Sequence, residues 1–413
     1  MTSHDGAQER RGQQGERGQQ GQSGQQRQEH PADGEASDEE LLAARRRAAG
    51  LGADRTLHRW SAHLPIATRL SALAAAAPEV VGPDEPVDIY GNTVVARLEE
   101  EVARLLGKEA AAFFPTGTMA QQVALRCWAG RTGNATVALH PKAHPEVHEG
   151  GALHAVSGLR TVHPTREPRL PTAGEVRDFG EPFGTLMLEL PLRDAGFVLP
   201  SWDELEEVVA AARERDAVVH FDGARLWECT PHFGRSLAEI AGLADTVYVS
   251  FYKSLDGLSG AALAGPRTLV DEAVTWRHRY GGQVFQQYPA AVAALLGLKN
   301  TLPRLPDYVA HARVVADALR EGFAAAGVPW SRVHPGQPHT HQFQVWLPYD
   351  PDVLTEAALG QAEETKTQLF GRWFSDGPPG LAVTEVTVTE AGLEWTPGDV
   401  SDAAAEFVRR IPG

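Results

Sequence analysis

The chain has 413 residues, of which 42% are hydrophobic and 22% are charged, so it can bury the large core of a globular protein. The formal net charge of −16 argues against a nucleic-acid partner, because phosphate contacts need clustered Lys and Arg. No apolar run predicts a membrane span, and the polar start is not a secretory signal. Cys127 and Cys229 indicate neither a disulfide framework nor a metal cluster. We therefore expect a cytoplasmic protein without a metal site.

Residues 1–36 form a low-complexity segment of Gln, Gly, Arg and Glu with almost no apolar side chains. Such a composition cannot bury enough surface to offset chain entropy, so it predicts a disordered tail. An interaction tail is the functional alternative to a merely solvated extension. The first expected helix covers residues 38–49.

The folded body alternates helices with short apolar strands. The apolar residues of 94–106 fall on one helical face, Gly107 ends that helix, and 110–114 is expected to be a buried strand. Further helices are expected over 118–128 and 204–215. Three apolar runs with little alternation are typical of strands covered on both faces, namely 185–190, 217–221 and 246–251. This order predicts an α/β fold with a mainly parallel sheet flanked by helices.

The pattern changes after a helical stretch at 290–300. Strands with more alternation are expected over 343–347 and 383–389, and helices over 350–368 and 399–410. Pro303, Pro306 and 335–338 are expected to mark joints. The resulting prediction is a tail at 1–36, a large domain at 37–300 that includes the amino-terminal helix, and a small α+β domain at 301–413.

An acid and a lysine follow two of the predicted buried strands. Asp222 lies in His-Phe-Asp-Gly-Ala-Arg, and Lys253 lies in Ser-Phe-Tyr-Lys-Ser. Ligands of α/β folds bind at the carboxyl ends of strands. There, a lysine could form a Schiff base with pyridoxal 5′-phosphate (PLP), while an acid keeps the pyridine nitrogen protonated. Alone, Asp222 could be a helix cap and Lys253 a solvated loop lysine, but their joint placement favours the PLP hypothesis.

Other residues fit the same hypothesis with less specificity. Gly117 and Thr118 open a helix after a strand, which suits a phosphate but also suits an ordinary helix cap. His144 could stack on a pyridine ring or be a plain loop histidine. Arg225 could contact a phosphate or a carboxylate. The Gly281-Gly282 turn could cover a phosphate or simply join two segments.

These residues together resemble the threonine aldolase family, within the β-eliminating lyase group of fold-type-I PLP enzymes. The resemblance rests on five stretches in order: 88–91, 107–120, His144 with 149–151, 222–225, and Lys253 with Gly257 and Gly260. It implies that Lys253 carries the Schiff base, Asp222 contacts the pyridine nitrogen and Arg225 lies near the ring hydroxyl. It also implies that His144 stacks on the ring, that Gly117 and Thr118 hold the phosphate, and that the protein is a homodimer or homotetramer.

The part of the site that would bind the substrate departs from the family pattern. No second histidine occurs in 189–193, and the expected carboxylate-binding arginine is replaced by Thr384 and Glu385. The lysine expected before the Gly-Gly loop appears as His278, and the arginine expected in that loop as Phe285 or Gln286. Arg193 could replace the missing arginine. Tyr90, Arg193 and Glu385 are therefore the candidate substrate-binding residues.

The main functional hypothesis is a PLP-dependent lyase that cleaves a β-hydroxy-α-amino acid to glycine and an aldehyde. His144 and His278 are the candidate bases for the β-hydroxyl proton, and Lys253 completes the expected catalytic set. Two alternatives stay open, a PLP-dependent β-elimination on another amino acid and a PLP-binding homologue with altered catalysis.

Overall fold

The computed structural model describes residues 37–59 and 61–412. The expected disordered tail, 1–36, lies outside the described residues. The chain from Ala43 to Gly413 forms one compact unit, and all sites below lie in that unit. Within the described residues, no helix is long and apolar enough to cross a membrane.

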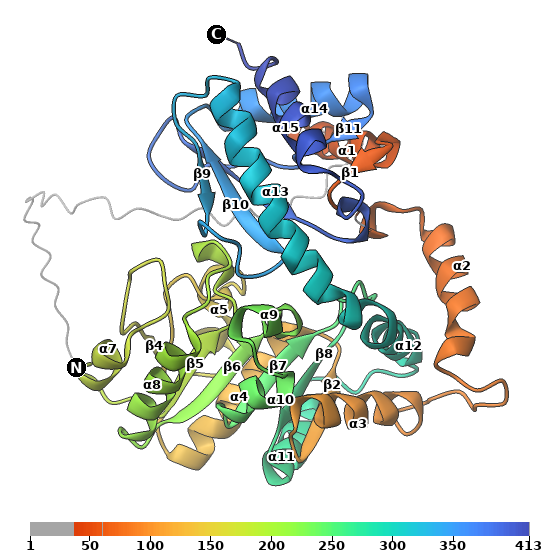
Figure 1. The fold of residues 1–413 in the computed structure, drawn as a ribbon. Helices are drawn as coiled ribbons and strands as arrows, with labels where there is room; N and C mark the ends of the chain where they lie inside the picture. The colour runs from red at the N-terminus through yellow and green to blue at the C-terminus, as the bar shows by residue number, and fades with distance from the viewer. Residues whose placement is uncertain (1–36, 60, 413) are drawn as a thin grey trace, which may run out of the picture. The chain divides into compact units, whose positions relative to one another are not determined.

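A seven-stranded sheet forms the centre of the compact unit (Figure 1). Its order is β2–β8–β7–β6–β5–β3–β4. The strands from β7 to β4 pair in parallel, whereas β8 is antiparallel to both β7 and β2. The predicted α/β fold with a mainly parallel sheet is therefore confirmed. The strands are β2 (Ala110–Phe114), β3 (Thr136–Ala138), β4 (Arg160–Val162), β5 (Thr185–Glu189), β6 (Val218–Gly223), β7 (Thr246–Ser250) and β8 (Ala261–Gly265).

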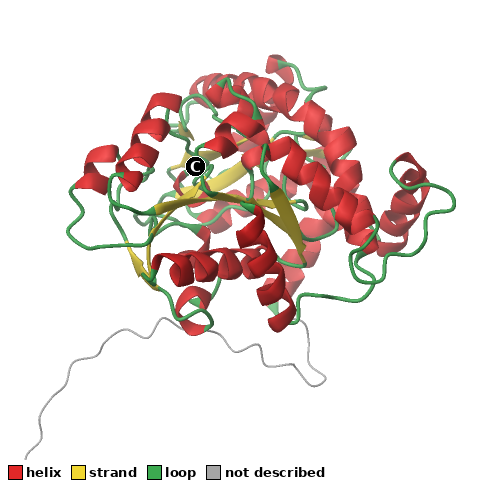
Figure 2. Ribbon diagram, turned by 90° about the horizontal axis from the view of Figure 1, so that it is seen from below, coloured by secondary structure: helices red, strands yellow, loops and turns green. Residues whose placement is uncertain are grey.

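Helices cover both faces of this sheet, as Figure 2 shows from below. Both faces need a cover because the side chains of each strand alternate between them, and on the edge strand β2 they enter two separate apolar cores. Phe113 packs on one face with Leu98 and Val102 of α3 (Val94–Leu106). Phe114 packs on the other face with Val123 of α4 (Gly117–Thr132). The same layers contain α8 (Trp202–Arg213), α10 (Leu237–Gly242), α11 (Arg267–Arg279) and α12 (Tyr288–Leu296).

A smaller antiparallel sheet, β12–β10–β9, lies in the carboxyl-terminal part of the chain. Its separate apolar core also contains Leu57, and the short strand β1 (Arg55–Thr56) pairs in parallel with β11 (Thr367–Gln368). The amino-terminal segment thus packs with the small sheet, and the boundary at residue 301 stays a prediction. The elements are β9 (Arg332–His334), β10 (Gln342–Leu347), β12 (Ala382–Thr387), α13 (Leu305–Ala325), α14 (Pro351–Thr365) and α15 (Pro397–Val408).

Pro303 lies in the first turn of a 3₁₀ helix that directly precedes α13, and Pro306 lies in the first turn of α13, where a missing N–H costs nothing. That these prolines mark a joint between domains stays a prediction. The strands β3, β4 and β8 were not predicted, since they are short or rich in alanine and glycine. The other helices are α1 (Asp38–Gly52), α2 (Ile66–Ala76), α5 (His144–Val147), α6 (Ala152–Ala155), α7 (Ala173–Arg177) and α9 (Thr230–Phe233).

Gly117 is required where α4 begins, because a Cβ added there would overlap the hydroxyl of Tyr248 on β7. We predict that Gly117→Ala lowers the free energy of unfolding by about 1–3 kcal/mol, the usual cost of overpacking. Gly180→Ala is the control, since nothing lies within 4 Å of its added Cβ. Equal urea midpoints for the two variants would contradict this prediction.

Candidate active site

Three ionisable side chains mark the carboxyl ends of adjacent strands. Glu189 ends β5 and pairs in register with Asp222 of β6. Lys253 lies three residues beyond Ser250, the last residue of β7. The next strand, β8, brings Ala261 back beside Ser250. The parallel arrangement therefore brings Asp222 and Lys253 to one edge of the sheet, where the sequence predicted a ligand site.

Asp222 is the buried acid of this edge, with 1% of its surface exposed. Its Oδ1 accepts a hydrogen bond from the backbone N–H of Ala224 at 3.1 Å. Burial raises the pKa of the Asp222 carboxyl above its ordinary value, and the positive charge of Lys253 opposes that rise. A positively charged N–H placed beside this carboxyl would favour its ionised form.

Lys253 lies on a closed turn. The turn ends where Gly257 N donates to the carbonyl of Phe251 at 2.8 Å, and a Cβ at Gly257 would lie 2.7 Å from that oxygen. Burial lowers the pKa of Lys253 to about 8, and the positive charge of Arg225 adds to this effect. Asp222 and Glu189 oppose it. The amine is thus easier to deprotonate than an ordinary lysine.

Glu189 is a site residue that the sequence analysis did not single out. Its Oε2 accepts from His144 N at 2.7 Å and its Oε1 accepts from Arg193 N at 3.2 Å. Burial, with the nearby charge of Asp222, raises the pKa of Glu189 to about 7. The sequence did contain a signal for this residue, because Glu189 is a charged residue at the carboxyl end of an otherwise uncharged, buried strand.

His144 begins the short helix α5 and is oriented by another acid. Its Nδ1 lies 3.3 Å from Oε1 of Glu149, whose side chain is almost fully buried. Since a carboxylate accepts, this contact favours a proton on Nδ1 and leaves Nε2 as the acceptor. The His148 ring lies next to it, with a centroid distance of 5.2 Å.

The turn at Gly117 and Thr118 does act as a helix cap. The Thr116 side chain accepts from Met119 N at 3.2 Å, at the amino terminus of α4. The helix has 16 residues, so its free N–H groups and dipole still suit an anion. Whether Gly117 and Thr118 hold a phosphate stays a prediction.

Two arginines of this edge contact the small sheet. Arg225 donates from Nε to Oε1 of Gln342 at 2.8 Å. Arg193 donates from Nη2 to Oε2 of Glu385 on β12 at 2.9 Å, and both side chains are half-buried. Arg193 lies near enough for its charge to lower the pKa of Lys253. The structure therefore brings Arg193 and Glu385 together as an ion pair beside the lysine.

His278 and Tyr90 have their contacts elsewhere. His278 is exposed in the last turn of α11, and its Nδ1 lies 2.9 Å from Oε1 of Gln283. Tyr90 is 56% exposed and meets Phe285 edge to face, with ring centroids 5.6 Å apart. Within the part of the chain that is described, neither residue forms a hydrogen bond, ion pair or ring contact with Lys253 or Asp222. Their assigned roles stay predictions.

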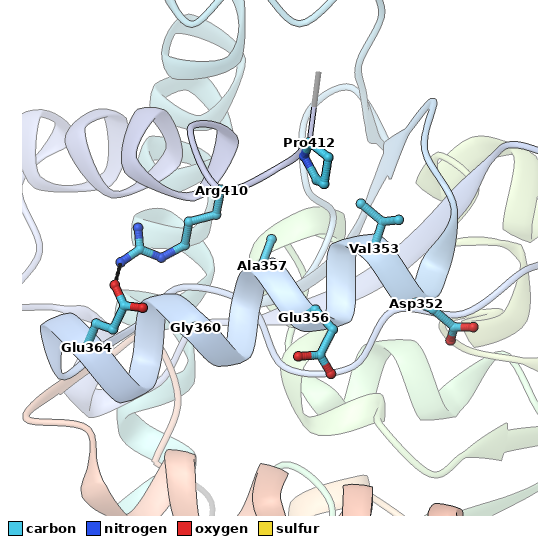
Figure 3. A pocket seen from close by; sticks show the side chains of 8 residues that line it. All are labelled: Asp352, Val353, Glu356, Ala357, Gly360, Glu364, Arg410 and Pro412. Carbon is cyan, nitrogen blue, oxygen red and sulfur yellow. Dashed lines mark hydrogen bonds and ion pairs between the residues drawn. The ribbon is translucent and has the colours of Figure 1, made fainter.

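The residues at this edge fit PLP. The buried acid Asp222 would pair with the ring nitrogen of PLP, and the amine of Lys253, with its lowered pKa, would react with the aldehyde. The amino terminus of α4 would bind the phosphate. By contrast, a surface hollow on α14, lined by Asp352, Glu356, Glu364 and Arg410 among others, contains none of the predicted site residues (Figure 3).

Comparison with known proteins defines the class. The family model described as β-eliminating lyase matches residues 72–329, so the chain belongs to that family. The low-specificity L-threonine aldolase of Escherichia coli K12 is 32% identical over 244 residues, covering 57% of this chain and 72% of that protein. The predicted resemblance to the threonine aldolases is therefore confirmed.

Solved structures agree with this family and fold. A Listeria monocytogenes protein provisionally named an L-allo-threonine aldolase has a TM-score of 0.78 and 31% identity, covering 90% of this chain and 99% of that one. An Exiguobacterium protein, provisionally an aromatic amino acid β-eliminating lyase/threonine aldolase, scores 0.79 at 32% identity, covering 89% and 99%. A PLP-bound serine palmitoyltransferase from S. paucimobilis scores 0.59 at 17%, covering 82% and 83%, and shows the fold alone.

The lowered pKa of Lys253 makes a prediction about its reactivity. Only the neutral amine is nucleophilic, so reductive methylation at Lys253, quantified by mass spectrometry, should rise with pH through a midpoint near 8. Asp222→Asn should move this midpoint lower, because the Asp222 charge raises the pKa of the amine. A midpoint near the ordinary lysine value of about 10.4 would contradict the prediction.

Proposed function

We propose that this protein is a PLP-dependent lyase that cleaves a β-hydroxy-α-amino acid into glycine and an aldehyde. The observation that carries the proposal is the placement of buried Asp222 and of Lys253, whose amine has a lowered pKa, just beyond or at the carboxyl ends of the adjacent strands β6 and β7. Membership of the β-eliminating lyase family and the named threonine aldolases among its relatives support it.

The residues of this chain have separate tasks in that reaction. Lys253 would hold the cofactor through its aldehyde, and Asp222 would keep a proton on the ring nitrogen. PLP, when bound, supplies a ring that accepts the electrons of the breaking carbon–carbon bond. His144 would stack on the ring and accept the β-hydroxyl proton at Nε2, because Glu149 fixes its Nδ1. His278 is the second candidate base.

The ion pair between Arg193 and Glu385 bears on substrate binding. An α-carboxylate needs a cation, and Arg193, four residues beyond the end of β5, is one of two arginines whose charge acts on Lys253. Because Glu385 already accepts from its Nη2, the substrate would have to share or displace that contact. We propose that Arg193 binds the carboxylate and that Glu385 competes for it.

We also propose a homodimer or homotetramer. Several large apolar side chains are exposed near the glycine loop and the segment before α3, which is typical of a surface covered by another protein chain. They are Ile89, Tyr90, Val284, Phe285 and Tyr288. Sedimentation of the purified protein as a monomer at micromolar concentration would contradict this proposal.

An assay for aldehyde tests the proposed reaction. The PLP-loaded protein should release aldehyde and glycine from threonine, allo-threonine or phenylserine, and Lys253→Ala should abolish that release. Pyruvate and ammonia from serine or cysteine, without aldehyde from any hydroxy amino acid, would instead support β-elimination. Absence of both products would contradict a lyase.

The competing roles of Arg193 and Glu385 predict opposite effects on substrate affinity. Arg193→Ala should raise KM about 10–100-fold, because a charge-assisted hydrogen bond contributes about 1.5–3 kcal/mol. Glu385→Gln should lower KM. Arg304→Ala breaks an exposed Arg–Glu pair of the same 2.9 Å length and serves as the control. A wild-type KM in Arg193→Ala would exclude the carboxylate role.

A further inference from the structure

A buried glutamate and a buried histidine meet between the two sheets. Glu228 ends a short 3₁₀ helix, Leu226–Glu228, and is 0% exposed. His341 lies directly before β10 and is 3% exposed. Its Nε2 lies 2.9 Å from Oε2 of Glu228. Neither residue belongs to the set predicted from the sequence.

Hydrogen-bond chemistry determines the protons on this pair. Nδ1 of His341 lies 3.0 Å from the carbonyl oxygen of Val388, which can only accept, so Nδ1 carries a proton. Nε2 faces a carboxylate, so a second proton lies between these two atoms. The pair is thus a charged imidazolium beside a carboxylate, or its neutral equivalent with the proton on oxygen.

The surroundings of Glu228 favour the charged form. Burial alone would raise the pKa of the Glu228 carboxyl, and the charge and hydrogen bond of His341 oppose that rise. The positive charge of Arg225 and the hydrogen bond from Ser254 act in the same direction, and the pKa of Glu228 is lower than usual. A buried charge that is paired in this way resists separation, because either partner alone would be left uncompensated.

This pair is linked directly to the turn that carries Lys253. The hydroxyl of Ser254, the next residue, donates to Oε2 of Glu228. The indole N–H of Trp227 donates to the carbonyl of Ser250 at 2.8 Å, at the start of the same turn. Consecutive residues, Trp227 and Glu228, therefore hold the turn at both sides of Lys253.

The small sheet contacts both ends of this short helix. His341 contacts Glu228, while the neighbouring Gln342 accepts from Arg225 at 2.8 Å. Arg225 also lowers the pKa of Lys253 through its charge. The segment His341–Gln342 is thus connected to the Lys253 turn through Glu228. The same segment also contacts Arg225, whose charge acts on the amine of Lys253.

We propose that Glu228 and His341 are positioning residues, which act through Ser254 to hold Lys253 in its reactive place and tie it to the small sheet. The proposal concerns the placement of the lysine and depends on the proposed function only for the reaction that Lys253 serves. It assigns no contact with substrate to either residue.

Amide hydrogen exchange of the cofactor-free protein tests the placement. In Glu228→Gln, His341→Gln and Ser254→Ala, the amides of residues 251–257 should exchange at least 10-fold faster than in the wild type. Ser254→Thr keeps the hydroxyl and should stay near wild type. Glu175→Gln is the matched control, because it removes the carboxylate of a capping box on α7 that also pairs with Arg169. It should leave these amides unchanged.

A kinetic measurement separates positioning from stability. The rate at which PLP attaches to Lys253, followed by absorbance at saturating PLP in fully folded protein, should fall at least 10-fold in Ser254→Ala and Glu228→Gln. The Glu175→Gln protein should keep the wild-type rate even if its unfolding midpoint drops. A purely structural pair would lower the midpoint without changing this rate.

Wild-type exchange of residues 251–257 in Ser254→Ala and Glu228→Gln would overturn the proposal. If Glu228→Gln does not fold, Ser254→Ala decides the matter, because it removes only one hydroxyl. A wild-type protein that takes up no PLP would contradict the proposed function, whereas the exchange experiment would still decide whether Glu228 and His341 place the turn.

Discussion

The burial of ionisable groups at the carboxyl ends of β5, β6 and β7 is the constraint on which the site depends. A lone buried charge is costly, so such groups are kept only where opposite charges and hydrogen bonds compensate them. Here, the charges of Glu189 and Asp222 act on the amine of Lys253, while burial raises the pKa values of the two acids and lowers that of the amine. Small changes in placement therefore decide where the protons lie, which is the property that acid–base and imine chemistry require.

The contacts around this edge follow from that constraint. The backbone N–H groups of His144 and Arg193 donate to the Glu189 carboxylate and stabilise it. Glu189 thereby holds in place the candidate residues for cofactor stacking, His144, and for substrate binding, Arg193. Arg193 and Arg225 in turn reach the small sheet. The two sheets are thereby joined through Arg193 and Arg225, whose charges both lower the pKa of Lys253.

Local sequence signals predicted much of the large sheet. The helix at Val94–Leu106 and the strand at Ala110–Phe114 were expected with the bounds observed, because a one-sided apolar pattern, a terminating glycine and a continuous apolar run are local properties. Contacts between distant segments left no such signal. The pairing of Arg193 with Glu385 and of Glu228 with His341 depends on how the two sheets meet, and β8 is too rich in alanine and glycine to read as a strand.

The central claim is that Lys253 is the residue to which PLP attaches. Borohydride reduction of the PLP-loaded protein, followed by protease digestion and mass spectrometry, tests it directly. The account predicts one major pyridoxyl-modified peptide, with the label on Lys253. Predominant labelling of Lys142, Lys299 or another lysine, with Lys253 unmodified, would contradict the account.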